Sequence, residues 1–256
     1  MKLAFHLYCQ LPFGRLHSRA PEIIELARLI GRTPSAVAMK LVNFASLDPA
    51  ITSSGRSGLK NASQADRETW REFHADWEGL DAECDALTRT LQLEQVVNNQ
   101  GRSAFAEDAA IYLGEEREAL VSVRRRQNFF RRSVLASYES KCCMSGVTTN
   151  DLIVASHIVP WASDEKNRLN PHNGLCLSSI HDRAFDRGLI TVMPNLSIRV
   201  SDQIKQEGER TKLGRMLSNL EGTKIQPPRR FMPAPEFLQW HNDERFEKLR
   251  NVPDDI

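Results

Sequence analysis

The most constraining feature of this sequence is a stretch from residue 152 to residue 188 in which short apolar runs alternate with turn residues. Residues 152–155 form an apolar run with β-branched members, which predicts a strand that ends at His157. A polar loop follows. The pair Asn173-Gly174 then predicts a turn, because both residue types tolerate positive φ angles, and residues 175–177 predict the returning strand.

A short helix is predicted directly after this hairpin. Ser178 or Ser179 is a suitable N-cap, and Gly188 is a suitable residue for the C-terminal end. The predicted helix carries four further polar or aromatic residues: His181, Asp182, Phe185 and Asp186. The stretch therefore predicts a strand, a loop, a strand and a helix that aim three polar side chains at one place.

These three side chains suit hydrolysis of a phosphodiester with one metal ion. His157 is the candidate general base, because an imidazole has a pKa near working pH and can take a proton from water. Asn173 is expected to hold the loop that presents His157 through backbone contacts. His181 is expected to bind a divalent cation, which polarises the phosphate and neutralises charge on the leaving oxygen.

The same residues resemble the His-Asn-His signature of HNH endonucleases, the ββα-metal nucleases. Three blocks carry the resemblance in order: FFRRSVLASYESKCCMSG, SHIVPW and NGLCLSSIHDRAFDRG. Any one of these histidines alone would be more typical of a structural residue, but the ordered combination favours a nuclease. The resemblance covers roughly residues 124–200, and the wording is similar to the branch of predicted restriction endonucleases. It implies Mg²⁺ or Mn²⁺, and an imidazole ligand also admits Ni²⁺ or Co²⁺.

One position departs from the family pattern. HNH nucleases often have Asp or His before the base as a metal ligand, whereas this chain has Ser156. A serine hydroxyl is a weak ligand, so other oxygen atoms are expected to complete the site. The candidate metal ligands are His181, Ser156, Asp182 and Asp186.

Composition limits the possible classes of protein. The chain has 256 residues, 41% of them hydrophobic, and a formal net charge of +1. A DNA-binding protein of this charge needs clustered basic residues. Its five cysteines show no CxxC spacing, so neither a disulfide framework nor a complete zinc ribbon is predicted. No membrane span or signal peptide is predicted, and we expect a cytoplasmic enzyme.

Two helices near the N-terminus predict a helix-turn-helix. Pro21 begins the first helix, Gly31 ends it, and Thr33 caps a second helix that starts at Pro34. The alternative is an ordinary helical hairpin in a core. In the first reading the second helix contacts DNA bases, and the candidates are Arg32, Thr33, Ser35, Lys40 and Asn43. Residues 1–20 predict a small strand or an extended arm.

A polar loop and an aromatic helix follow this pair. The loop, residues 46–63, is either a DNA backbone contact through Arg56 and Lys60 or a solvated loop. Ser63 and Asp66 predict a capping box, and the helix after it has an apolar stripe typical of a core: Trp70, Phe73, Trp77 and Leu80.

The charge pattern changes sign before the nuclease motif. Residues 78–118 are acidic and predict a helical connector with a role in dimerisation. Five arginines then predict a phosphate-contacting face on one helix: Arg124, Arg125, Arg126, Arg131 and Arg132. A solvated charged face is the alternative. Arg183 and Arg187 are candidates for stabilising the charge that develops on the phosphate.

The C-terminal part predicts a hairpin over residues 189–200 and a final helix. Trp240 and Phe246 are expected to dock this helix, and His241 is expected to be structural.

We therefore expect an α+β protein with a helix-turn-helix-like DNA-binding domain (1–80), a helical connector (81–123) and a ββα-metal HNH nuclease domain with a C-terminal extension (124–256). The expected function is a metal-dependent DNA endonuclease of restriction type, with modification-dependent cutting as a subclass. It would act on double-stranded DNA, as a homodimer if it cuts both strands. The alternatives are a nonspecific or nicking HNH nuclease, and a DNA-binding regulator with a degenerate nuclease domain.

Overall fold

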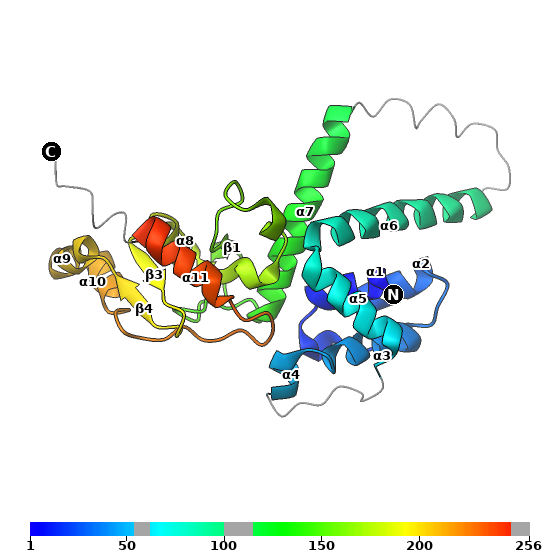
Figure 1. The fold of residues 1–256 in the computed structure, drawn as a ribbon, viewed down its shortest axis with the longest axis horizontal. Coiled ribbons are helices and arrows are strands. Elements are labelled where there is room, and N and C mark those ends of the chain that lie inside the picture. Colours follow the sequence, from blue (N-terminus) through cyan, green and yellow to red (C-terminus); the bar gives the residue numbers. More distant parts are fainter. Residues whose placement is uncertain (54–61, 100–114, 247–256) are drawn as a thin grey trace. The chain divides into compact units, whose positions relative to one another are not determined.

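The structure is a computed structural model that describes residues 1–53, 62–99 and 115–246. The chain divides into two compact units, Met1–Ser133 and Val134–Ile256. Helices dominate the first unit, and the second contains two small antiparallel sheets with helices around them (Figure 1). This mixture agrees with the predicted α+β class.

The described part of the first unit is helical. Its elements are α1 (Lys2–Gln10), η1 (Phe13–Arg15), α2 (Pro21–Leu29), α3 (Pro34–Ala45), α4 (Pro49–Ser53), α5 (Gln64–Ala75) and α6 (Trp77–Asn99). Helix α7 (Glu115–Ser137) begins in this unit and ends in the second.

The prediction of a strand or extended arm at the N-terminus is wrong. Residues 2–10 form α1, and its Phe5 side chain is fully buried. The Phe5 ring lies 5.0 Å from the ring of Phe44 and 4.6 Å from that of Phe73. Tyr8, one turn later, donates a buried hydrogen bond of 2.8 Å to Asp48. The helix is therefore stabilised by partners from α3 and α5 that local patterning does not reveal.

The predicted helix boundaries around α3 and α5 are confirmed. Thr33 accepts a hydrogen bond from the backbone N–H of Ala36, and Gly31 has a φ angle of +62°. Ser63 and Asp66 form the predicted capping box. The aromatic helix is broken at Asp76, whose φ of −150° ends α5 before α6 begins.

The second unit contains both predicted strand pairs, but the turn predicted at Asn173-Gly174 is wrong. Asn173 ends a 3₁₀ helix, and Gly174 has an extended φ of −130° and begins the returning strand. Its elements are η2 (Asn150–Leu152), β1 (Ile153–His157), η3 (Glu165–Asn167), η4 (Pro171–Asn173), β2 (Gly174–Ser178), α8 (Ser179–Asp186), β3 (Ile190–Val192), β4 (Ile198–Val200), α9 (Asp202–Arg210), α10 (Lys212–Ser218), α11 (Pro235–His241) and the π-helical turn η5 (Asn242–Phe246). Strand β1 pairs with β2, and β3 pairs with β4, both antiparallel. The sequence patterns did not predict α9 and α10.

The C-terminal helix docks on the second sheet as expected. Elements α11 and η5 pack against β3, and His241 and Phe246 are both buried, whereas Trp240, also expected to dock the helix, is partly exposed. The His241 ring stacks on Phe185 with centroids 3.6 Å apart, and its Nε2 atom donates to the backbone carbonyl of Phe185 at 3.0 Å. His241 therefore has the structural role that was predicted.

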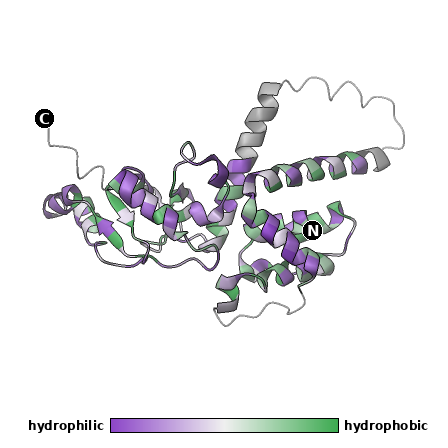
Figure 2. Cartoon of the chain, in the orientation of Figure 1, coloured by the Kyte–Doolittle hydropathy of each residue, from purple (hydrophilic) through white to green (hydrophobic). Residues whose placement is uncertain are grey.

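The elements differ in hydropathy. The strands β3 and β4 are largely hydrophobic, whereas α9 is mostly hydrophilic, and hydrophilic and hydrophobic residues alternate along α6 (Figure 2).

Among the described helices, none combines the length and apolar character that crossing a bilayer requires.

Candidate active site in the second unit

The β1–β2 hairpin and α8 bring the three motif residues into one small substructure. The register pairs His157, the last residue of β1, with Gly174, the first of β2. Helix α8 follows β2 at once and packs against both strands. Ser178 caps this helix, and Gly188, with a φ of +68°, ends it. These are the boundaries expected from the sequence.

The side chain of Asn173 fixes the backbone that follows His157 through hydrogen bonds. Its Oδ1 atom accepts from the backbone N–H of Val159 at 2.8 Å, and its Nδ2 atom donates to the carbonyl of the same residue at 3.0 Å. Nδ2 also lies 3.3 Å from the carbonyl oxygen of Asn167. Asn173 is 1% exposed, so these bonds form in a dry environment where they hold the backbone firmly. The predicted backbone contacts of Asn173 are therefore present.

The surroundings of His157 define which ring nitrogen can take a proton. Nε2 lies 2.9 Å from the carbonyl oxygen of Arg168. A carbonyl only accepts, so Nε2 carries the hydrogen and Nδ1 is the basic nitrogen of the neutral ring. Burial lowers the pKa of His157, although the hydrogen bond to Arg168 acts in the opposite direction. The ring is therefore neutral at pH 7, as a general base requires.

The loop that holds His157 is itself braced. The Nε atom of Arg168 donates to the carbonyl of Trp161 at 2.8 Å, and the guanidinium lies 5.4 Å from the centroid of the Trp161 ring. The Trp161 ring also meets the His157 ring edge-on, with centroids 5.6 Å apart. Trp161 and Arg168 are positioning residues that the sequence patterns did not identify.

His181 is 2% exposed, and its two nitrogen atoms have different surroundings. Nδ1 lies 3.0 Å from Ser178 Oγ and 3.3 Å from Cys142 Sγ, whereas the buried Nε2 has no hydrogen-bond partner among the described residues. A hydrogen on Nε2 would be a buried donor without an acceptor, at a cost of about 1–3 kcal/mol. The surroundings therefore favour Nδ1 as the donor and Nε2 as a bare lone pair.

A bare lone pair on a buried imidazole fits a divalent cation. Metal-binding histidines usually donate their other N–H to a neighbouring acceptor, which fixes the tautomer and the ring orientation. Ser178 Oγ and Cys142 Sγ provide such acceptors. Burial alone would raise the pKa of the Cys142 thiol, but hydrogen bonds from His181, Ser145 and the backbone lower it to about 6.

The oxygen candidates come from β1, which carries Ser156, and from α8, which carries Asp182 and Asp186. The hydroxyl of the buried Ser156 hydrogen-bonds to Asp182. Burial and the nearby charge of Asp186 raise the pKa of Asp182, and the Ser156 hydrogen bond opposes this shift. Asp186 is exposed and lies 3.9 Å from Arg183. Within the described ranges no three His, Cys, Asp or Glu side chains form a metal-binding cluster.

The predicted basic candidates differ in their surroundings. On α8, Arg183 is exposed, and Arg187, which ends the helix, is exposed as well. On α7, Arg131 is exposed and Arg126 and Arg132 are partly buried, while the side chains of Arg124 and Arg125 lie outside the described residues.

The first unit presents only part of the predicted DNA-reading set. Arg32, Thr33 and Ser35 are exposed at the start of α3. Lys40 instead binds the buried Asp66 at 2.9 Å, and Asn43 is 8% exposed because it faces the core. Arg56 and Lys60 lie outside the described residues.

Comparison with known proteins agrees with this geometry. A search of curated proteins finds no match to the chain. A family model described as HNH endonuclease matches residues 142–193. The match begins at Cys142, beside His181, and includes the whole β1–β2–α8 substructure. The second unit therefore carries an HNH endonuclease domain, and the protein is a nuclease of the hydrolase class.

Proposed function

We propose that this protein is a metal-dependent DNA endonuclease of restriction type, with His157 as its general base. The observation that carries the proposal is the hydrogen bond from His157 Nε2 to the Arg168 carbonyl, because it makes Nδ1 the proton acceptor of a neutral ring. The family match to residues 142–193 supports the phosphodiester as the bond that is hydrolysed.

In this mechanism Nδ1 of His157 takes a proton from a water molecule, which attacks the phosphorus in line with the leaving 3′ oxygen. The product then carries a 5′ phosphate. Asn173 keeps the 157–159 backbone in place while the ring accepts the proton. Arg183 and Arg187 are exposed on the same helix as His181 and are candidates for stabilising the added charge.

A divalent cation would neutralise charge on the phosphate and the leaving oxygen when bound. The residues that would hold it are His181, through Nε2, with Asp182, Asp186 and Ser156 as oxygen donors. Oxygen ligands favour Mg²⁺ or Mn²⁺, and the imidazole also admits Ni²⁺ or Co²⁺.

Target selection would belong to α2 and α3. These helices are joined by a turn at Gly31 and are packed together as a helix-turn-helix requires. Arg32, Thr33 and Ser35 are exposed at the start of the second helix, where such motifs contact bases. Lys40 and Asn43 are left out of this proposal, because one is ion-paired and the other is buried.

The decisive variant is His157→Ala. It should reduce cleavage of plasmid DNA by at least about 10²-fold, the lower range of general-base contributions, while DNA binding is retained. His17→Ala is the matched control, because His17 is an exposed histidine of the first unit. Full cleavage by the His157 variant would refute the assignment of the base.

The restriction role is tested with two plasmid preparations, one from a methylating host and one unmethylated, incubated with Mg²⁺ or Mn²⁺ and with a chelator control. Discrete fragments with sequenced common ends would support a restriction-type enzyme. Fragments from only one of the two preparations would show that cleavage depends on DNA methylation. Random cutting of both would indicate a nonspecific nuclease, and binding without metal-dependent cutting would indicate a regulator.

A further inference from the structure

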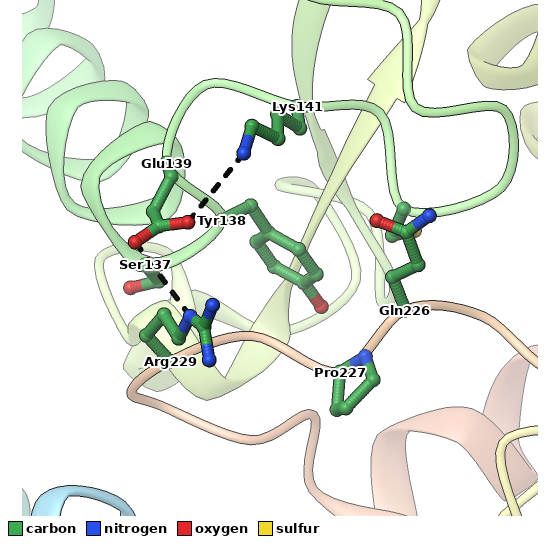
Figure 3. Close-up of a pocket in the computed structure, with 8 residues that line it drawn as sticks. Ser137, Tyr138, Glu139, Lys141, Gln226, Pro227 and Arg229 are labelled. Carbon is green, nitrogen blue, oxygen red and sulfur yellow. Dashed lines mark ion pairs between the residues drawn. The ribbon is translucent and has the colours of Figure 1, made fainter.

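The same unit contains a pocket of about 240 Å³. Its walls come from the C-terminal end of α7, the turn after it and a segment near residue 227 (Figure 3). Two backbone hydrogen bonds join these walls, from Arg229 N to Ser137 O at 2.7 Å and from Gln226 N to Cys143 O at 2.8 Å. The backbone segments that form the pocket are therefore hydrogen-bonded to each other.

Hydrogen-bond donors dominate the lining. Lys141 and Arg229 both approach the carboxylate of Glu139, at 3.7 Å and 3.6 Å. Gln226 adds a side-chain amide on the opposite side (Figure 3). The side chains of Lys141, Glu139 and Arg229 are 49%, 40% and 56% exposed. Ion pairs this exposed contribute little, so Glu139 can leave the two cations at small cost.

Tyr138 supplies a donor that has no acceptor. Its side chain extends between Arg229 and Gln226 (Figure 3). The residue is 6% exposed, and its hydroxyl has no hydrogen-bond partner among the described residues. Burial raises the pKa of Tyr138 well above its ordinary value, so the hydroxyl keeps its hydrogen. Buried polar groups are normally paired, which points to an oxygen acceptor from outside the chain.

The backbone at this place is also unusual. Glu139 and Ser140 both have a φ of 53°, and two consecutive non-glycine residues in the left-handed region store about 1–3 kcal/mol each. This conformation places Glu139 between Lys141 and Arg229. Strain of this kind is typical of functional sites.

The chemistry fits a phosphate group. An ammonium, a guanidinium, an amide and a hydroxyl all donate, and Lys and Arg are the usual partners of DNA phosphates. The cavity of about 240 Å³ is smaller than the roughly 300 Å³ at which pockets for drug-sized molecules begin, which favours a small group such as a single phosphate. Cys143 lines the pocket, and its neighbour Cys142 contacts His181.

We propose that this pocket binds a backbone phosphate of the DNA substrate, other than the one that is cut, through Lys141 and Arg229, with Glu139 as a carboxylate that must move aside. This inference rests on the proposed function as a DNA nuclease. It adds Lys141 and Arg229 to the residues proposed to bind DNA. Glu139 would instead oppose DNA binding, because its carboxylate competes with the phosphate.

The test measures DNA binding by the full chain carrying His157→Ala, so that the duplex stays intact, over a series of salt concentrations. Replacing both Lys141 and Arg229 by Ala should lower the slope of log affinity against log salt by about 0.9, the value for one phosphate contact. Raising the salt concentration from 50 to 200 mM would then reduce the DNA affinity of the double variant by a factor about 3.5-fold smaller than the factor for the parent. Lys212→Ala, at an exposed lysine outside the pocket, should leave the slope unchanged.

Glu139→Gln provides the reverse test, because it removes the competing carboxylate and should tighten DNA binding. An unchanged slope in the double variant, or weaker binding by Glu139→Gln, would overturn the proposal. Tyr138→Phe, which removes only the hydroxyl, should weaken binding without changing the fold. Weaker binding here would support the proposal, and unchanged binding would count against it.

Two further arms separate the possible failures. If calorimetry with inorganic phosphate shows binding that the double variant loses, while DNA binding is unaffected, the pocket is a free-anion site and the DNA proposal fails. If the wild-type chain cuts DNA but the pocket variants bind it like their parent, only the pocket proposal fails. If the wild-type chain neither binds nor cuts DNA, the proposed function fails with it.

Discussion

The tautomer of His181 is determined by two side chains, one of which lies far away in the sequence. Cys142 Sγ is 3.3 Å from Nδ1 but 39 positions earlier in the chain, and Ser178 Oγ is 3.0 Å away, three positions earlier. Both contacts favour a hydrogen on Nδ1 and a lone pair on Nε2. A residue recognised as a candidate ligand thus depends on two neighbours that are not ligands.

The change Cys142→Ala should weaken metal binding. Without the sulfur acceptor the ring of His181 loses part of its orientation, and loss of such outer partners typically costs 10–100-fold in metal affinity. Calorimetric titration with Mn²⁺ measures this effect directly, without DNA.

Cys142→Ser is the matched variant, because a hydroxyl can still accept from Nδ1. It should keep an affinity closer to that of the wild type than Cys142→Ala does. Equal Mn²⁺ affinity in the Ala variant and the wild type would show that Cys142 does not position His181.

At the level of elements, the buried His241 of α11 contacts both β3 and α8. His241 contacts Thr191 on β3 at 2.9 Å through Nδ1 and the Phe185 carbonyl on α8 at 3.0 Å through Nε2. Burial lowers the pKa of His241 to about 4, against a hydrogen bond to Phe185 that acts to raise it.

This shift predicts a loss of stability in acid. Below pH 6.5 the unfolded chain binds a proton at His241 that the folded chain does not, so the free energy of unfolding falls as pH falls. The contribution is complete above pH 6.5 and is lost progressively down to pH 4, by about 3 kcal/mol in total. Urea unfolding at several pH values measures this change.

His241→Phe should remove this part of the pH dependence, since phenylalanine keeps an aromatic ring against Phe185 but has no titrating group. His17→Ala should retain it, because His17 is exposed. An identical pH dependence in His241→Phe and the wild type would contradict the assignment.

For the whole molecule, the structure describes two compact units and one HNH motif. One such site cuts one strand, so cleavage of both strands predicts a homodimer or two successive binding events. Supercoiled plasmid distinguishes the two, because nicked circles accumulate only when the cuts are separate.

Mixing provides the sharper measurement. An excess of the His157→Ala chain should form dimers with one active site and shift the product from linear to nicked DNA. The same excess of His17→Ala chain should leave linear DNA as the product. Unchanged linear product in the first mixture would rule out paired active sites in a dimer.

The sequence by itself determined most of the local structure of the site. Apolar runs predicted β1 and β2, and Ser178 and Gly188 predicted the ends of α8. These features depend on residues close together in the chain, where φ preferences and capping act directly. The turn expected at Asn173-Gly174 is not formed, because Asn173 ends η4 and Gly174 is an extended strand residue.

The tertiary structure decided what no local pattern encodes. Residues 2–10 became a helix because Phe5 packs among aromatic rings from other helices. The proton of His157 is placed by the Arg168 carbonyl, and the pocket joins the end of α7 to the segment at Arg229. Such contacts require the chain to be folded, because distant partners meet only when burial of apolar surface brings them together.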